Sequence, residues 1–266
     1  MTEVRAKKAL GQHFLVDLNI ARKICDALSG GTAEAPATVL EVGCGMGVLT
    51  QFLLQRGDLT TYGAEIDTES VDYLHDRFPA FAPRLIAGDF LKMDLRAAFP
   101  DVSALRIIGN FPYNISSQIF FKILEHRDFV PECVGMIQKE VAVRLAEPPG
   151  SKEYGILSVL LQAWYDIEYL FTVGESVFNP PPKVKSAVIR LRRNGVAQLD
   201  CDERLFVRVV KASFGQRRKM IRNSLRAAFG DFGGAEHPFF TSRAEQLSVG
   251  QFVELTNWVS EHVIKN

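Results

Sequence analysis

Apolar runs with strand-like composition alternate with helical patterns along the first 190 or so residues of this 266-residue chain. After a helical pattern over residues 17–29, helical segments fall between several of the predicted strands. Such alternation is typical of a parallel sheet covered by helices on both faces, so we predict an α/β fold. The predicted strands are residues 38–42, 60–66, 84–87, 105–108, 133–137 and 186–191. The predicted helices between them are residues 48–55, 69–77, 116–125 and 139–146.

Turn-forming residues interrupt this periodicity at residues 194–200. We therefore place a domain boundary there, between an α/β domain of residues 1–195 and a small all-helical domain of residues 196–266. Helical patterns in the second domain cover residues 203–212, 217–229, 243–247 and 249–263.

Composition excludes several classes of protein. With 47% hydrophobic and 23% charged residues, the chain is typical of a soluble globular protein. The sequence predicts neither a secretory signal nor a membrane span, because no apolar run is long enough. The four cysteines are far apart and form no CxxC pair, which argues against zinc, disulfides or any metal site. We expect a cytoplasmic protein.

The net charge of zero hides a strong asymmetry. The segment from Lys183 to Arg226 contains thirteen basic and three acidic residues, a net charge of +10 that leaves −10 for the rest of the chain. Concentrated positive charge predicts a polyanionic partner such as a nucleic acid, although a solvated helical face is the alternative. A basic helix is predicted to begin at residues 214–219. The residues expected to contact RNA phosphates are Lys7, Lys8, Arg217, Arg218, Lys219 and Arg222.

A glycine-rich loop at residues 43–47 separates the first predicted strand from its helix. Alternate glycines permit backbone angles closed to other residues and let a ligand approach the main chain. The spacing is GxGxG rather than the GxGxxG of dinucleotide sites, and no P-loop lysine is nearby. The loop therefore indicates a nucleoside ligand without a pyrophosphate, of which S-adenosylmethionine is the common one. A tight strand-to-helix turn is the alternative.

Acidic residues follow the next two strands. Glu65 lies 18 positions after Gly47, where a carboxylate can accept both ribose hydroxyl hydrogen bonds. Asp67 competes for that role, but it is also placed to cap the next helix. Asp89 is predicted to recognise an adenine amino group, with an Asx-turn as the alternative.

Asn110-Phe111-Pro112-Tyr113 ends the fourth predicted strand. Ligands of open α/β sheets bind at the carboxyl ends of strands. An amide, a ring that fixes the backbone and a phenol at that edge are suited to hold a planar amine-bearing ring such as adenine. On its own the tetrapeptide is also compatible with a simple turn.

Together these motifs resemble the KsgA (RsmA) family of rRNA adenine N6-dimethyltransferases, which is related to the Erm enzymes and mitochondrial homologues. The resemblance covers essentially the whole chain. It is carried by residues 11–15, 41–47, 65–67, 88–89, 110–116, 138–144 and 178–184. It implies a Rossmann-like class I methyltransferase sheet with helices on both faces, followed by a small helical domain that binds rRNA.

The resemblance also implies roles for individual residues and S-adenosylmethionine as the cofactor. His13 and Leu15 match the motif that closes over the cofactor, and Asn110 matches the residue that bridges cofactor and target base. Gly43, Gly45, Glu65 and Asp89 match the loop and strand ends that hold the methionine, ribose and adenine parts. The chain departs from the family at His13, Cys44 and Phe111, where Asn, Pro and Leu are common.

The expected chemistry depends on position rather than on acid–base catalysis. The lone pair of the adenine amine is delocalised into the ring, whereas the sulfonium is already a strong methyl donor, so alignment is the main task. We expect the Asn110 side-chain oxygen and the Phe111 carbonyl to accept the two amine hydrogens. Tyr113 and Phe178 are expected to stack on the base, with prolines 180–182 presenting Phe178 rigidly.

The predicted function is dimethylation of two adjacent adenosines near the 3′ end of small-subunit (16S) rRNA. The expected partner is the immature small ribosomal subunit, and the protein is expected to act as a monomer away from membranes. Alternatives are an Erm-type enzyme acting on large-subunit rRNA and a non-enzymatic assembly or transcription factor. Glu140 and Arg144 are expected to form an i,i+4 ion pair rather than to contact RNA.

Overall fold

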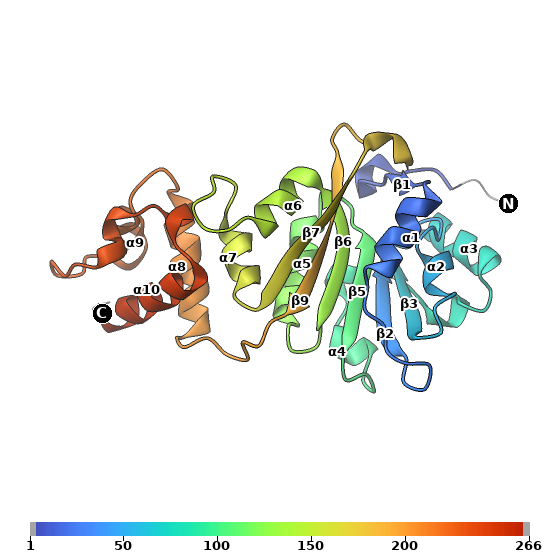
Figure 1. The fold of residues 1–266 in the computed structure, drawn as a ribbon, viewed down its shortest axis with the longest axis horizontal. Helices are drawn as coiled ribbons and strands as arrows, with labels where there is room; N and C mark the ends of the chain where they lie inside the picture. The colour runs from blue at the N-terminus through green and yellow to red at the C-terminus, as the bar shows by residue number, and fades with distance from the viewer. Residues whose placement is uncertain (1–3, 263–266) are drawn as a thin grey trace. The chain divides into compact units, whose positions relative to one another are not determined.

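The computed structural model describes residues 4–262 and contains a seven-stranded sheet with the strand order β4-β3-β2-β5-β6-β9-β7 (Figure 1). β2 to β6 are parallel, and β9 runs antiparallel to β6. The strands are β2 (Ala37–Val42), β3 (Leu59–Glu65), β4 (Leu85–Ala87), β5 (Leu105–Asn110), β6 (Glu132–Gln138), β7 (Tyr165–Val173) and β9 (Ser186–Arg193). The predicted α/β fold is thus confirmed, and β7 is a strand that the sequence analysis did not predict.

The strand order reverses between β2 and β5. From β2 the chain proceeds outward through β3 and β4, and it then returns to β5 on the other side of β2. Because crossover connections are right-handed, the helices of the two halves cover opposite faces of the sheet. Ligands of such sheets bind at the carboxyl ends of the strands beside this reversal. The loop after β2 carries the glycines, and Asn110 is the last residue of β5.

Helices and short 3₁₀ turns connect the strands. The α-helices of this part are α1 (Leu18–Asp26), α2 (Thr50–Leu53), α3 (Thr68–Arg77), α4 (Leu95–Ala98), α5 (Ser116–Glu125), α6 (Lys139–Ala146) and α7 (Ile156–Gln162). The 3₁₀ turns are η1 (Lys8–Leu10), η2 (Ala82–Arg84), η3 (Phe90–Lys92) and η4 (Glu175–Val177). Helix α2 is shorter than predicted, and α4 and α7 were not predicted. No helix within residues 4–262 is both long and apolar enough to cross a membrane.

A second, two-stranded sheet joins distant parts of the sequence. β1 (Phe14–Leu15) pairs antiparallel with β8 (Phe178–Asn179), with Leu15 opposite Phe178. Both of these side chains belong to a hydrophobic cluster that also contains residues of α1, β2, β5, β6 and β9. The N-terminal arm is therefore fixed to the loop that precedes β9.

The chain divides into two compact units. One comprises the chain up to Ala142 together with Ile167–Arg193, and the other comprises Val143–Asp166 and the chain from Asn194 onward. The chain passes between the units three times, and the last passage, between Arg193 and Asn194, lies next to the predicted boundary at residue 195. Val143–Asp166, however, groups with the C-terminal helices, in part because the ring of Trp164 packs edge-on against Phe206 with 6.2 Å between centroids.

Three helices form the rest of the second unit: α8 (Glu203–Gly215), α9 (Ile221–Phe229) and α10 (Val249–His262), with the 3₁₀ turns η5 (Pro238–Thr241) and η6 (Ala244–Gln246). The predicted basic helix over residues 217–229 is present as α9, but it begins only at Ile221. Residues 216–220 make a non-helical connection between α8 and α9.

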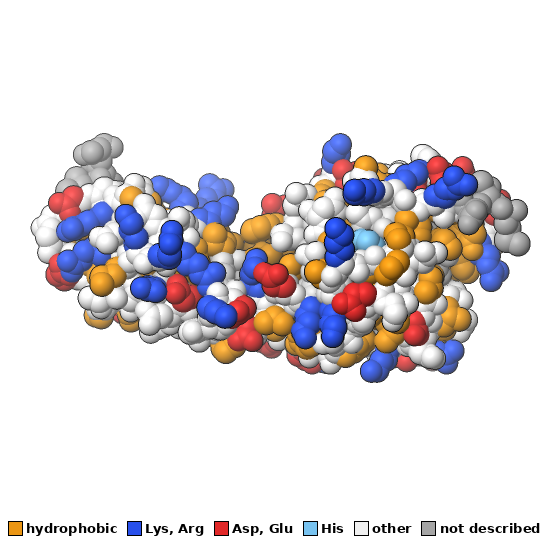
Figure 2. Space-filling view, turned by 90° about the horizontal axis from the view of Figure 1, so that it is seen from above, with side chains coloured by type: hydrophobic (Ala, Val, Ile, Leu, Met, Phe, Trp, Pro, Cys, Tyr) orange, Lys and Arg blue, Asp and Glu red, His pale blue; other side chains and the backbone are white. Residues whose placement is uncertain are grey.

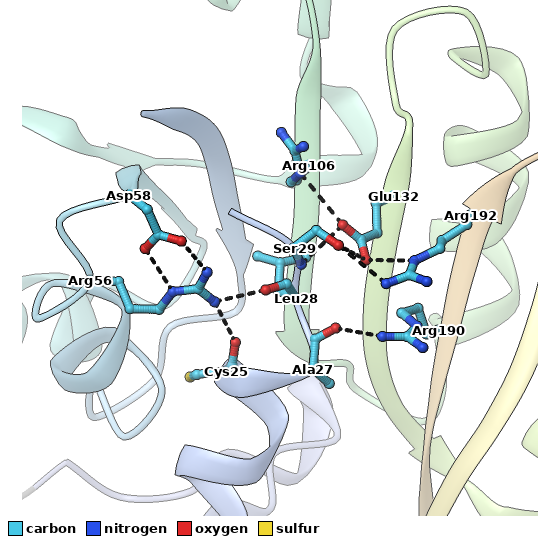
Figure 3. Close-up of polar contacts among 10 residues, drawn as sticks. All are labelled: Cys25, Ala27, Leu28, Ser29, Arg56, Asp58, Arg106, Glu132, Arg190 and Arg192. Atoms are coloured by element: carbon cyan, nitrogen blue, oxygen red, sulfur yellow. Dashed lines mark hydrogen bonds and ion pairs between the residues drawn. The ribbon is translucent and has the colours of Figure 1, made fainter. Parts of the chain in front are cut away.

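A buried carboxylate lies at the amino end of β6 (Figure 3). Glu132, 4% exposed, accepts hydrogen bonds from the backbone N–H and hydroxyl of Ser29, both at 3.1 Å. Arg192 Nε is 3.3 Å and Arg106 Nε 3.5 Å from its oxygens. These donors offset the cost of removing the charge from water.

Beside this network, arginines bind the C-terminal end of α1 (Figure 3). Arg56 donates to the carbonyls of Cys25 and Leu28, each at 2.8 Å, while Asp58 holds the other side of its guanidinium. Arg190 donates to the carbonyl of Ala27 at 3.2 Å. Cations at helix C-termini satisfy carbonyls that have no partner within the helix. Since α1 directly follows β1, these contacts anchor the N-terminal arm.

Candidate active site

A pocket of about 190 Å³ lies at the carboxyl ends of β2, β3, β4 and β5. Its walls combine residues from Ala9 to Ile115, which are far apart in the sequence. The predicted site residues that line it are His13, Gly43, Gly45, Glu65, Asp89, Asn110, Phe111 and Tyr113. The structure therefore brings together most of the residues that the sequence analysis selected for catalysis and cofactor binding.

The glycine loop after β2 has the backbone conformation that its composition predicts. Gly43, Gly45 and Gly47 have φ angles of +75°, +53° and +75°, a region that residues with a Cβ rarely adopt. A Cβ on Gly45 would also lie 3.0 Å from the ring of Phe14. The loop is thus a tight turn, and it exposes its backbone to the pocket.

Glu65, rather than Asp67, faces the pocket. The residue is 3% exposed, and its carboxylate accepts hydrogen bonds from the backbone N–H groups of Gly45 and Asp67, both at 2.8 Å. Burial raises the pKa of Glu65, and these hydrogen bonds only partly oppose that effect.

Asp67 is held by other side chains. It forms an ion pair with Lys7 and accepts hydrogen bonds from Ser70 (3.0 Å) and Gln12 (3.4 Å). Burial alone would raise the pKa of Asp67, but the hydrogen bonds, led by that from Lys7, lower it. It occupies the N-cap position of α3 without a side-chain bond to a helix N–H.

Asp89 forms the turn that was considered from the sequence, and it also lies at the pocket. One carboxylate oxygen accepts the N–H of Leu91 at 2.9 Å and so caps η3, and the residue also lines the pocket. Lys122, from α5, holds η3 and the residue after it in place. Its ammonium group donates to the carbonyls of Leu91 (3.1 Å) and Met93 (2.6 Å) and lies 5.6 Å from the ring centre of Phe90.

Asn110, the last residue of β5, has a fixed amide orientation. Its Nδ2 donates to the backbone carbonyl of His13 at 2.9 Å. No donor among residues 4–262 bonds to its Oδ1. The side chain therefore presents an acceptor to a ligand.

Phe111 has a structural role that its sequence position did not reveal. Its side chain is 1% exposed and covers Gly109 of β5 and Gly135 of β6, which are partners in the sheet. A Cβ on Gly135 would lie 2.5 Å from the Phe111 ring, and one on Gly109 would lie 2.8 Å away. Two paired glycines thus make the space that this ring fills, which anchors the loop carrying Asn110.

Tyr113 and His13 lie beside each other at the mouth of the pocket, with ring centres 5.5 Å apart and planes inclined by 30°. The Tyr113 hydroxyl is 2.5 Å from Ser186 Oγ, and burial raises the pKa of Tyr113. His13 Nδ1 is 2.8 Å from the carbonyl of Pro180, so this nitrogen is the donor.

A second pocket, of about 470 Å³, shares Gly11, Gln12, His13 and Tyr113 with the first. Its remaining lining residues are Ala6, Lys8, Gln138, Pro180, Pro181, Pro182, Lys183 and Val184. Figure 2 shows the surface of the molecule from above the view of Figure 1.

Leu15 and Phe178 differ from the prediction. They are 3% and 4% exposed, pack in the hydrophobic cluster and line neither pocket. The reason is strand geometry, because successive side chains of β1 point to opposite faces. Phe14 therefore lines the first pocket, whereas Leu15 is in the core. A strand of two residues shows no periodicity, so no signal in the sequence distinguishes Phe14 from Leu15.

Three of the predicted RNA-binding residues have partners within the protein. Lys7 forms ion pairs with Asp67 and Glu69, so its charge is neutralised within the protein. Arg217 donates to the backbone carbonyls of Lys152 and Tyr154, and Arg222 pairs with Glu236. The other three, Lys8, Arg218 and Lys219, are exposed.

The reversed parallel sheet, the GxGxG loop and the acidic strand ends define a class I methyltransferase. The chain matches the family "Ribosomal RNA adenine dimethylase" over residues 3–261 and belongs to that family. This confirms the predicted enzyme class, an S-adenosylmethionine-dependent rRNA adenine dimethyltransferase.

Curated relatives span the whole chain. "Ribosomal RNA small subunit methyltransferase A" of Parabacteroides distasonis is 59% identical over 267 residues, covering 100% of this chain and 98% of the relative. The protein of the same name from Bacteroides thetaiotaomicron is 56% identical and covers 98% of this chain and 96% of the relative.

Two solved structures share the fold over nearly all of this chain. A dimethyladenosine transferase from Plasmodium falciparum superposes with a TM-score of 0.76 at 23% identity, covering 95% of this chain and 100% of that one. The 23S rRNA methyltransferase ErmE gives a TM-score of 0.64 at 26% identity, with coverages of 92% and 99%.

Proposed function

We propose that this protein transfers methyl groups to N6 of two adjacent adenosines near the 3′ end of small-subunit rRNA during assembly of the subunit. The observation that carries this proposal is the Asn110 amide. Its nitrogen is bonded to the His13 carbonyl, so its oxygen is available to an amine beside Tyr113. The specific rRNA target is supported by the names of relatives that are 54–59% identical.

The pocket fits S-adenosylmethionine, which supplies a methyl group already activated on a sulfonium. Gly43 and Gly45 leave room for a ligand against the backbone, and the Glu65 carboxylate suits the ribose hydroxyls. Ile66 lines the same pocket with 51% of its surface exposed, an apolar surface for the adenine ring. Asp89 suits the adenine amino group.

Lys122 provides a test of how the adenine end of the pocket is held. In Lys122→Met, no ammonium group bonds to the carbonyls of Leu91 and Met93, so η3 loses its support from α5. We expect affinity for S-adenosylmethionine to fall about tenfold, the effect of losing roughly 1.4 kcal/mol, which is close to the lower end of the range for hydrogen bonds to charged groups. Titration calorimetry measures this. Lys152→Met, in the other unit with a side chain that is 90% exposed, is the control, and equal affinities for both variants would contradict the role.

The target base is placed by the residues at the mouth of the pocket. The Asn110 oxygen and the Phe111 carbonyl accept the amine hydrogens, which turns the lone pair toward the methyl group and stabilises charge developing on nitrogen. Tyr113 stacks on the base, an interaction of roughly 1–3 kcal/mol. Phe178 supports this site from the core through the pairing of β8 with β1.

The helical unit provides a surface for rRNA. Arg218 and Lys219 are exposed in the turn after α8. The exposed face of α8 adds Arg204, Arg208 and Lys211, which follow each other at helical spacing. We propose that these five residues bind rRNA phosphates.

Two alternative functions require features that differ from those of this protein. An Erm-type enzyme would modify large-subunit rRNA, but the identity to ErmE is 26% against 59% for a small-subunit enzyme. A non-enzymatic assembly factor would not need Gly43, Glu65, Asp89 and Asn110 together in one pocket.

Labelled S-adenosylmethionine tests the proposed function directly. The protein is incubated with undermethylated small and large ribosomal subunits, and the labelled nucleotides are mapped. We expect label on two adjacent adenosines near the 3′ end of the small-subunit rRNA only. Label on the large subunit alone would establish the Erm-type alternative, and no label would favour the assembly factor.

A monomeric state and a cytoplasmic location remain predictions.

A further inference from the structure

Two lysines line the second pocket and two more are next in sequence to residues that line it; we refer to these four, Lys8, Lys139, Lys183 and Lys185, as the lysine cluster. Lys8 and Lys183 line this pocket, as do Gln138 and Val184. Lys139 follows Gln138, and Lys185 follows Val184. The N–H of Lys139 donates to the carbonyl of Lys185 at 2.9 Å, so these two residues are adjacent in space. All four belong to the unit that contains the sheet.

The charges of the lysine cluster are not neutralised within the protein. All four residues are exposed, and none forms an ion pair with a carboxylate in the described part of the chain. Neighbouring cations behave differently, since Lys7 pairs with Asp67 and Glu69, and Arg190 with Glu168. Figure 2 shows Lys and Arg side chains on this side of the molecule together with hydrophobic and acidic ones. Unpaired charges of one sign around a pocket attract a polyanion.

The pocket within the cluster is suited to a base. It is bounded by the rings of Tyr113 and His13 and by Pro180, Pro181 and Pro182. Proteins that bind single-stranded nucleic acid combine aromatic stacking surfaces with a cationic path for the backbone. Both elements are present here within one unit.

We propose that the lysine cluster binds the backbone phosphates of the RNA strand on both sides of the nucleoside in the second pocket. This inference rests on the proposed function and specifies how the strand is held at the catalytic unit, in addition to the surface on the helical unit. The cluster holds the strand so that one base at a time reaches Asn110 and Tyr113.

The test compares charge-neutral variants in RNA binding at several salt concentrations. The variant with all four lysines changed to Gln, the single variant Lys183→Gln, and the control Lys152→Gln are assayed with a single-stranded RNA of the 3′-terminal target sequence. Lys152 lies in the other unit with its side chain 90% exposed. Each lost phosphate contact is expected to reduce the slope of log affinity against log salt by roughly 0.7. The Gln variants should bind S-adenosylmethionine with wild-type affinity. A variant with the four lysines changed to Arg should have the wild-type slope.

Three outcomes would overturn the proposal. These are an unchanged slope in the fourfold Gln variant, the same loss in Lys152→Gln, or a parallel loss of S-adenosylmethionine affinity that Arg does not restore. If the wild-type protein methylates small-subunit rRNA but the fourfold Gln variant has an unchanged slope, only the proposed role of the lysine cluster is refuted. Wild-type protein that methylates no rRNA refutes the proposed function.

Discussion

Asn110→Ala is expected to reduce the rate of methyl transfer at least about 100-fold, the scale of effect seen when one positioned polar group is removed from a reacting centre. The affinity for S-adenosylmethionine should fall less, because Gly43, Glu65 and Asp89 still line the pocket. The reason lies in the amide geometry. With Nδ2 donating to the His13 carbonyl at 2.9 Å, Oδ1 is held in one direction, and Ala offers no acceptor there.

Single-turnover transfer to undermethylated small subunits measures the rate, and titration calorimetry measures cofactor affinity. Asn19→Ala is a matched control, since Asn19 is exposed on α1 and its backbone N–H, rather than its side chain, bonds to Asp17. This control should transfer methyl groups at the wild-type rate. Wild-type turnover by Asn110→Ala would remove the amine-positioning role.

The position of the site was predictable because strand ends are encoded locally. Short apolar runs predicted β2, β3 and β5 closely, and the residues that follow them meet wherever parallel strands lie side by side. The chemical character of Glu65, Asp89 and Asn110 was then sufficient to predict a nucleoside pocket. The strand order, which fixes the reversal between β2 and β5, is not encoded in any one segment.

What the sequence did not reveal depends on contacts between distant residues. Lys7 was predicted to bind RNA, but its partner Asp67 is 60 positions away. The space for the Phe111 ring exists because Gly109 and Gly135 are paired across two strands. A two-residue strand such as β1 is too short for periodicity to show which of Phe14 and Leu15 faces the pocket.

The division into units shows the same limit. Residues 143–166 precede the antiparallel strand β9, so their place in the sequence assigned them to the first domain. Their contacts, such as that of Trp164 with Phe206, join them instead to the helical unit. Only the packing of large side chains reveals this grouping.

Glu41 should make the stability of the protein depend on pH. This residue of β2 is 1% exposed, and its carboxyl accepts a hydrogen bond from Thr50 Oγ1 at 2.6 Å. Burial raises the pKa of Glu41 from 4.5 to about 8, and the nearby charge of Glu65 acts in the same direction. The folded protein therefore keeps this carboxyl protonated at neutral pH, whereas the unfolded chain loses the proton near pH 4.5.

The direction of the effect follows from this difference. The contribution of Glu41 to the free energy of unfolding is complete below pH 4.5. It is lost as the pH rises through about 8, because only the unfolded state releases the proton in that range. At 1.36 kcal/mol per pKa unit, the total loss is on the order of 3–5 kcal/mol. Glu41→Gln keeps an acceptor for Thr50 but cannot ionise, so its free energy of unfolding should fall much less between pH 5 and 8. Denaturant unfolding across this range measures the difference.

Glu125→Gln, on the exposed surface of α5, is the control and should follow the wild-type profile. If Glu41→Gln follows it as well, the buried carboxyl is not the source of the pH dependence.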